Sequence, residues 1–86
     1  KKGTVDAVSG IYGVDAEFIQ YSVCKTNRLT KHPIRELHFP ETALVAGVIR
    51  EEEVYIPDGD FRLQIGDKAI VFALPEAKIS LEKLFH

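Results

Sequence analysis

One uninterrupted apolar run constrains the fold of this chain more than any other feature. It covers residues 43–49 with the sequence ALVAGVI, and Arg50 follows it directly. A strand that is apolar on both faces is typical of the interior of a covered sheet. Gly47 and the β-branched pair after it favour a strand over a helix. We therefore expect a central strand over residues 43–50.

Further strands are expected on both sides of this run. Residues 68–74 form a second buried strand, in which Ala69, Val71 and Ala73 face one way and Ile70 and Phe72 the other. Residues 16–25 are a third strand, apolar on both faces. The acidic tip at residues 51–53 predicts a hairpin, with residues 54–56 pairing back.

Two helices are expected to cover the sheet. A short helix over residues 32–37 would have Thr30 as its N-cap and Pro33 in its first turn. A C-terminal helix would begin at Pro75 and carry an apolar stripe, which consists of Ala77, Leu81, Leu84 and Phe85. The predicted class is α+β: an antiparallel β-sheet of about four strands with a C-terminal helix and one short helix.

Composition narrows the functional classes. The chain has 86 residues, 11 basic and 13 acidic, and a net charge of −2, which suits one domain and argues against a nucleic-acid partner. No apolar run approaches the roughly 20 residues that span a bilayer, so direct membrane insertion is not expected. The opening residues 1–3, KKG without Met, lead us to expect a piece of a longer protein. We divide it into a lead-in over residues 1–15 and a domain over residues 16–86.

The sequence holds no convincing catalytic set, so we expect no enzyme. The distant alternative is a small Cys/His enzyme, in which Cys24 would pair with His32, His38 or His86. No motif supports that pairing, and an ordinary strand cysteine is the simpler interpretation.

Acidic and basic residues offer weaker candidates. Asp58 and Asp60 place two carboxylates close together in the turn at residues 57–60, where Gly59 is available for a positive φ. This makes a divalent-cation site an alternative. We favour solvated turns for these residues, for the acidic tip at residues 51–53 and for Asp67. Arg35 or Arg50 could hold a phosphate.

Three stretches together resemble a known family. They are residues 40–50 (PETALVAGVIR), 54–60 (VYIPDGD) and 65–72 (IGDKAIVF). They combine an apolar strand, an arginine, a hairpin, Ile-Pro-x-Gly-Asp and then Gly-Asp with a valine-containing strand. This combination resembles the C-terminal domain of TrkA-type potassium-uptake regulators. This domain, TrkA-C, is the second half of an RCK (regulator of potassium conductance) unit. The resemblance extends over about residues 16–85.

The resemblance implies a regulatory module that gates potassium uptake in response to a nucleotide or ion effector. Such a module is cytoplasmic and forms a homodimer, and it is held at the inner face of the membrane by a Trk-type potassium transporter. An NAD or ATP site is expected only in an upstream domain. Some relatives bind cyclic di-AMP, and others bind divalent cations. A purely structural assembly domain without any small-molecule ligand is the alternative.

The resemblance also suggests site residues. Cyclic dinucleotide sites of the family use apolar and arginine residues near the short helix and a proline near the hairpin. The matching positions here are Ile34, Arg35, His38, Phe39 and Pro57. A core role for Ile34 is an equally good interpretation. The strand that carries Phe18 and Cys24 is the expected dimer face.

Overall fold

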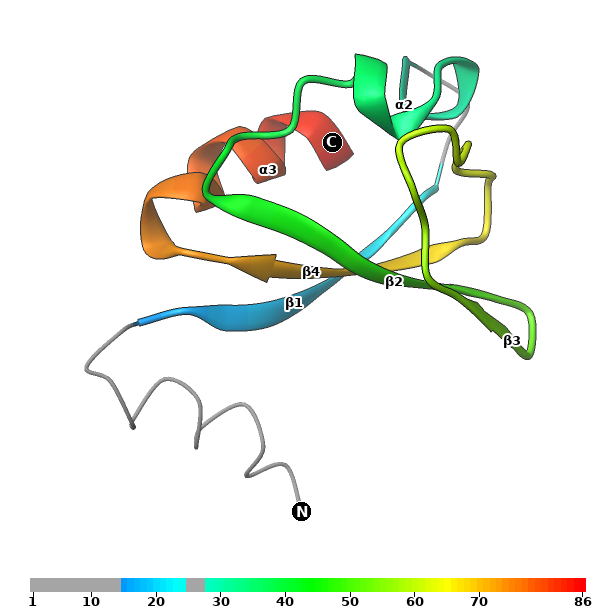
Figure 1. Cartoon of the computed structure of the whole chain (residues 1–86), viewed down its shortest axis with the longest axis horizontal. Helices are drawn as coiled ribbons and strands as arrows, with labels where there is room; N and C mark the ends of the chain where they lie inside the picture. The colour runs from blue at the N-terminus through cyan, green and yellow to red at the C-terminus, as the bar shows by residue number, and fades with distance from the viewer. Residues whose placement is uncertain (1–14, 25–27) are drawn as a thin grey trace.

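Strand β4 (Lys68–Ala73) lies inside a four-stranded antiparallel sheet of order β1-β4-β2-β3 (Figure 1). The computed structural model describes residues 15–24 and 28–86. Strand β1 (Glu17–Ser22) pairs with one edge of β4 and β2 (Ala43–Arg50) with the other. Strand β3 (Glu53–Tyr55) returns from a two-residue turn and pairs with the end of β2. The predicted α+β class and the antiparallel sheet are confirmed.

Alternation along β4 separates the two faces of the sheet. Ala69, Val71 and Ala73 are fully buried, whereas Ile70 and Phe72 keep part of their surface. This is the arrangement that the sequence predicted, because successive side chains of a strand point to opposite faces.

Strand β2 departs from simple alternation because it contains a β-bulge. Its register against β4 shifts between Val45 and Gly47, which leaves one extra residue in β2. As a result Val45 and Val48, three positions apart, both enter the core. Leu44 on the other face is 64% exposed. We expected the continuous apolar run to mean that both faces of β2 are covered. It instead reflects the bulge, which changes the positions along the strand that point into the core.

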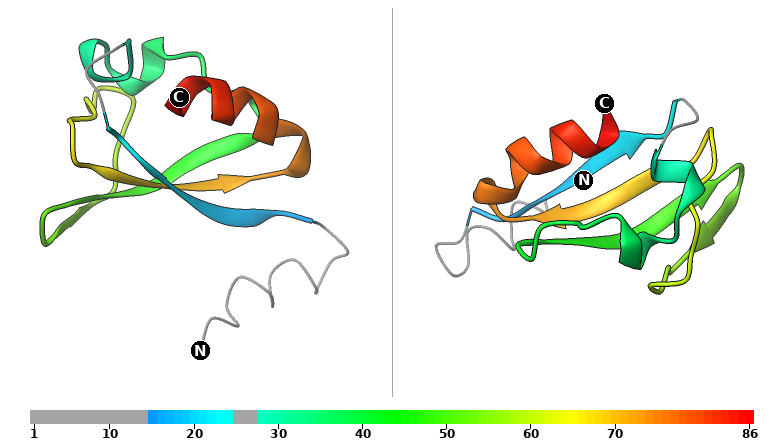
Figure 2. Two further views of the ribbon diagram at one scale, coloured as in Figure 1. Left: turned by 180° about the vertical axis from the view of Figure 1, so that it is seen from behind. Right: turned by 90° about the horizontal axis from the view of Figure 1, so that it is seen from above.

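All the helical elements lie on one side of the sheet (Figures 1 and 2). They are α2 (Arg28–Lys31), the 3-10 turn η1 (Ile34–Glu36), the 3-10 turn η2 (Pro75–Ala77) and α3 (Lys78–Phe85). The short helix expected over residues 32–37 is found as the shorter 3-10 turn η1, and a separate helical turn, α2, comes before it. Pro33 is extended, with ψ of 160°, and it separates α2 from η1. A proline disfavours helical geometry in the residue before it, here His32, which is consistent with α2 ending at Lys31. Thr30, expected as an N-cap, lies inside α2.

The core lies between this helical layer and the sheet. Leu81 of α3 is fully buried, and so is Ala77 just before the helix. Small side chains on β4, Ala69 and Ala73, face the same layer and leave room for a helix to approach closely. Within the described ranges, no helix is both long enough and apolar enough to cross a bilayer.

A buried ion pair joins the end of β2 to the turn before β4. Asp67 is 1% exposed, so its predicted place in a solvated turn is wrong. Its carboxylate accepts hydrogen bonds of 2.8 Å from Nε and Nη2 of Arg50 and from the amide of Gln64. The Arg50 guanidinium lies 5.2 Å and 5.0 Å from the ring centroids of Tyr55 and Phe61. Arg50 is therefore a structural residue here.

The surroundings of Asp67 set its ionisation. Burial raises the pKa of Asp67, but the hydrogen bonds from Arg50 and from the Gln64 amide outweigh burial, and the pKa is lowered. The preceding Gly66 has a φ of 95°, a conformation that favours glycine. Its amide donates to the Val23 carbonyl at 2.8 Å, and the Val23 amide donates to the Asp67 carbonyl at 2.9 Å. These two backbone hydrogen bonds attach the segment after β1 to the turn that carries Asp67.

Replacing Leu81 by alanine should lower the free energy of unfolding by about 2–5 kcal/mol, since it leaves a cavity under α3. The matched control is Ile79→Ala on the same helix, because Ile79 is 72% exposed. That control should change stability by no more than about 0.5 kcal/mol. Urea titrations followed by circular dichroism measure both. Equal losses in the two variants would contradict the placement of α3.

Replacing Asp67 by asparagine should cost about 3 kcal/mol, because it leaves the guanidinium of Arg50 without its counter-ion. We expect the low end of the range for buried pairs, since the Arg50 side chain is 24% exposed. Glu52→Gln is the control with the same change in charge at an exposed position.

The same pair predicts a pH dependence. The lowered pKa of Asp67 means that its contribution is complete above its ordinary pKa of about 3.9 and is lost as pH falls through the folded-state value below it. The stability difference between the parent chain and Asp67→Asn should therefore shrink as urea titrations are moved from about pH 6 towards pH 2. A constant difference over that range would contradict ionisation of Asp67 in the folded state.

Candidate functional site

A hollow of about 280 Å³ lies where η1 meets the loop after β3. Its walls come from three segments of the chain: η1, the start of β2 and the turn at residues 57–59. The lining residues are Ile34, Leu44, Val45, Pro57, Asp58 and Gly59. Two of the five residues suggested as a ligand site, Ile34 and Pro57, therefore share the walls of one cavity.

Backbone hydrogen bonds fix the turn to η1. The amide of Ile34 donates to the Phe61 carbonyl at 2.9 Å, and the amide of Arg35 donates to the Gly59 carbonyl at 3.0 Å. A Cβ at Gly59 would lie 3.3 Å from the Arg35 Cβ. Gly59 is thus needed for close approach, whereas the positive φ expected for it is not found: among the described glycines only Gly66 has one.

Arg35 and Asp60 form an ion pair at the rim of the hollow. The Arg35 side chain is 56% exposed and that of Asp60 71%. The hydrogen bond between them raises the pKa of Arg35 and lowers that of Asp60. Exposed pairs of this kind contribute little to stability. Breaking the Arg35–Asp60 pair would therefore cost little free energy.

His38 and Phe39 do not line this hollow. His38 is exposed and has a φ of 58°, a left-handed backbone conformation. Phe39 packs edge-on against Phe85, with ring centroids 6.0 Å apart, at the margin of the core. Ile34 packs against the core, as one interpretation held, and it also lines the hollow.

The two carboxylates considered for a cation already have contacts. Asp58 Oδ1 accepts the Asp60 amide at 2.9 Å, and the carboxylate of Asp60 pairs with Arg35. Residues 15–24 and 28–86 contain no group of three or more His, Cys, Asp or Glu side chains arranged to hold a metal ion.

Phe18 lies on the face of β1 that points away from the helical layer, whereas β1 ends at Ser22 and Cys24 follows it, so the strand expected over residues 16–25 is shorter than predicted. Phe18 is 40% exposed, and Cys24 is an exposed free cysteine. The Cys24 thiol lies 3.8 Å from the Ser22 carbonyl oxygen. Among the histidines considered as its base, His32 contacts Glu36 and His86 contacts Glu82.

Sequence reasoning missed the contributions of Leu44, Val45 and Gly59 to the hollow. The first two were assigned to the core because the bulge in β2 leaves no trace in an apolar run. Gly59 was treated as a turn residue, although a glycine between two aspartates is also the place where another backbone can pack closely.

Comparisons with known proteins agree with this architecture. The model of the TrkA-C domain family matches residues 18–86. The Trk system potassium uptake protein TrkA homolog 2 of Methanosarcina mazei is 37% identical over 81 residues, and TrkA homolog 1 of the same organism is 33% identical over 81 residues. Each alignment covers 94% of this chain but only 18% of the relative.

A solved structure described as "Structure of RCK domain with cda" has the same fold. Its TM-score is 0.69 at 22% sequence identity, and the match covers 80% of this chain and 97% of that one. At this identity the likeness concerns the fold alone. The family match extends over the sheet, the hollow at η1 and the last helix, and the chain belongs to the TrkA-C domain family.

Proposed function

We propose that this chain is a regulatory domain that binds a small effector and dimerises within a Trk-type potassium uptake regulator. The observation that carries the proposal is that Ile34 and Pro57, far apart in sequence, wall one hollow beside Arg35. In this proposal the domain acts in the cytoplasm at the inner face of the membrane, and it gates a Trk-type potassium transporter. It performs no catalysis.

The hollow suits an effector with both an apolar and an anionic part. Its walls are mainly aliphatic, from Ile34, Leu44 and Pro57, and a nucleobase packs well against such surfaces. Arg35 at the rim supplies a fork of donors that matches a phosphate. Cyclic di-AMP has both parts, and it is the first effector that we would test.

The effector changes function by favouring one arrangement of the domain over another. A ligand shifts an equilibrium only by its difference in affinity for the two arrangements. A ligand in this hollow would have different affinities for two arrangements of the domain, because η1, β2 and the turn at residues 57–59 all line the hollow and a shift of the turn would change its shape.

A divalent cation is the second candidate effector. Asp58 and Asp60 are adjacent in the turn, and hard cations prefer carboxylate oxygens. Such a cation would have to displace Arg35 from Asp60. Asp58→Asn should then abolish a calcium-dependent rise in melting temperature.

Thermal unfolding with cyclic di-AMP, ATP, ADP, NADH or calcium tests the proposal. A ligand at 100 times its Kd stabilises by about 2.7 kcal/mol, which for a domain of this size raises Tm by on the order of 10 °C. Arg35→Gln should weaken binding of the active nucleotide about tenfold, because it removes a charge-assisted contact. Lys83→Gln on α3 is the charge-matched control and should bind as the parent chain does.

Two outcomes would count against effector binding. If none of these ligands changes Tm, the domain is an assembly module without a small-molecule site. If a nucleotide binds equally well to the Arg35→Gln and Lys83→Gln variants, its site lies elsewhere on the domain.

A further inference from the structure

The guanidinium beside the hollow at η1 lies among carboxylates. A Cβ at Gly59, which lines this hollow, would lie 3.6 Å from Nε and 3.7 Å from Nη2 of Arg35. An anionic group of a ligand in the hollow therefore meets the Arg35 guanidinium beside Gly59. The hydrogen bond and the charge of Asp60 raise the pKa of Arg35, and the charges of Asp58 and Glu36 raise it further. Three carboxylates thus act on one guanidinium.

The backbone on both sides of Asp60 is hydrogen-bonded. The Asp60 amide donates to Asp58 Oδ1 at 2.9 Å, and the Phe61 amide donates to the Asp58 carbonyl at 3.2 Å. On the other side, the Gly59 carbonyl accepts the Arg35 amide at 3.0 Å. We therefore expect a ligand that displaces Asp60 from Arg35 to turn its side chain and leave the loop in place. The released carboxylate then stays near the guanidinium.

Two further arginines of this region have contacts with the main chain instead. Arg28 Nη2 donates to the Glu36 carbonyl at 3.2 Å, and Arg62 Nη1 donates to the Lys31 carbonyl at 2.8 Å. Arg35, in contrast, pairs with a side-chain carboxylate. Its guanidinium is therefore the one for which a ligand phosphate and Asp60 compete.

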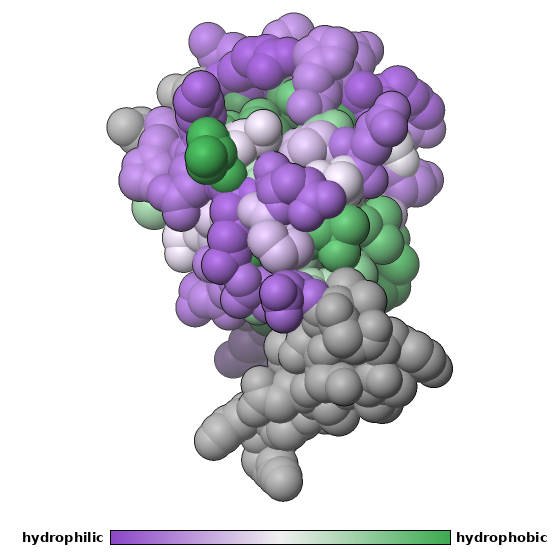
Figure 3. All heavy atoms as spheres, turned by 90° about the vertical axis from the view of Figure 1, so that its left-hand side faces the viewer, coloured by the Kyte–Doolittle hydropathy of each residue, from purple (hydrophilic) through white to green (hydrophobic). Residues whose placement is uncertain are grey.

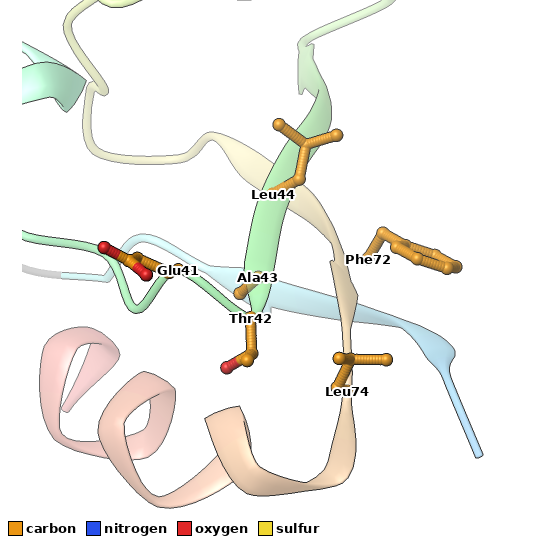
Figure 4. Close-up of a pocket in the computed structure, with 6 residues that line it drawn as sticks. All are labelled: Glu41, Thr42, Ala43, Leu44, Phe72 and Leu74. Atoms are coloured by element: carbon orange, nitrogen blue, oxygen red, sulfur yellow. The ribbon is translucent and has the colours of Figure 1, made fainter. Parts of the chain in front are cut away.

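Two other hollows are poorer places for an anionic ligand. One, of about 200 Å³, is mainly apolar, and its one charged lining residue is Glu41 (Figure 4). Apolar surface, which Figure 3 shows gathered at one side of a largely polar face, gives a phosphate no donor. The other hollow, of about 290 Å³, has Arg50 in its lining, but this guanidinium already binds Asp67. Of these three hollows, the one at η1 has an exposed guanidinium beside it.

Phosphate groups differ in the charge that they would bring to Arg35. A phosphate diester carries a single negative charge, whereas a phosphate monoester carries about −1.5 to −2 at pH 7. A diester that displaces Asp60 therefore replaces one unit of charge at the guanidinium by another. A monoester adds further negative charge close to the displaced Asp60 carboxylate and to Asp58. Like charges about 4 Å apart in water repel each other enough to weaken binding about fivefold.

We propose that Asp60 makes this site selective for phosphate diesters over monoesters and polyphosphates. In the free domain its carboxylate occupies Arg35, so a ligand has to replace it. In the complex the displaced carboxylate repels any additional negative charge. Selectivity of this kind comes from an unfavourable contact with the wrong ligand. The inference rests on the anion site of the proposed function, and it adds the residue that decides which anions the site accepts.

Isothermal titration calorimetry with cyclic di-AMP and with its linear form tests the proposal. The linear form, 5′-phosphoadenylyl adenosine, results from hydrolysis of one diester, so both probes have the same bases and sugars. Asp60→Asn should tighten binding of cyclic di-AMP by up to about fivefold, the equivalent of an exposed ion pair. It should tighten binding of the linear form by about a further fivefold. The greater flexibility of the linear probe cancels, because the same two probes are compared in both proteins.

Two controls isolate the role of Asp60. Glu52→Gln makes the same change in charge at an exposed position outside the lining of the hollow, and it should leave the ratio of the two affinities unchanged. A double-mutant cycle with Arg35→Gln shows whether Asp60 competes through Arg35. In the Arg35→Gln background, the gain in cyclic di-AMP affinity from Asp60→Asn should shrink, because no ion pair remains to be broken. Circular dichroism establishes that the variants are folded.

The outcomes separate this inference from the proposed function. If cyclic di-AMP binds but Asp60→Asn does not tighten the linear probe more than the cyclic one, Asp60 does not select among anions and the inference fails alone. Tighter binding of ATP than of cyclic di-AMP to the parent chain would also contradict the inference. If no probe binds to either the parent chain or Asp60→Asn, the anion site is wrong, and the proposed nucleotide effector fails with the inference.

Discussion

The ion pair between Arg50 and Asp67 is the interaction on which the loop side of this domain depends. Residues 56–67 contain no strand or helix, so the core alone does not determine their path. Asp67 accepts three hydrogen bonds at 2.8 Å, and Arg50 also donates to the Arg62 carbonyl at 3.1 Å. Burying a carboxylate is unfavourable unless its oxygens are paired, and here the pairing partners come from β2 and from the loop itself. The requirement to satisfy Asp67, together with the burial of Leu63, therefore anchors the loop.

The position of the candidate site follows from this fixed loop. Phe61 lies against the Arg50 guanidinium and its carbonyl accepts the Ile34 amide, so the loop and η1 are joined at the same point. A hydrogen bond therefore joins two walls of the hollow near Phe61, while the Arg35–Asp60 pair beside Gly59 is exposed. Walls that are already hydrogen-bonded to each other, beside an exposed ion pair, suit the recognition of an anion, because such a site needs less ordering on binding.

Sequence reasoning succeeded where one local rule decides the structure. Period-two alternation fixed β4, and the apolar stripe fixed the C-terminal helix. It failed where tertiary contacts decide. A bulge shifts register without changing composition, Pro33 shortened an expected helix, and Asp67 looked like any turn aspartate because its partner lies 17 positions away. For the site, Ile34 and Pro57 were identified through family resemblance, and only the fold brings them to one cavity.

The bulge in β2 has a further consequence for where charge lies. Leu44 and Arg50 are separated by an even number of positions, so a regular strand would point both side chains to the same face. Either the leucine would be buried, or the guanidinium would stand on the side of the sheet that points away from the helices. The one unpaired residue between Val45 and Gly47 reverses the parity halfway along the strand. One added residue thus lets a single strand present an uncharged surface outward at its start and a cation inward at its end.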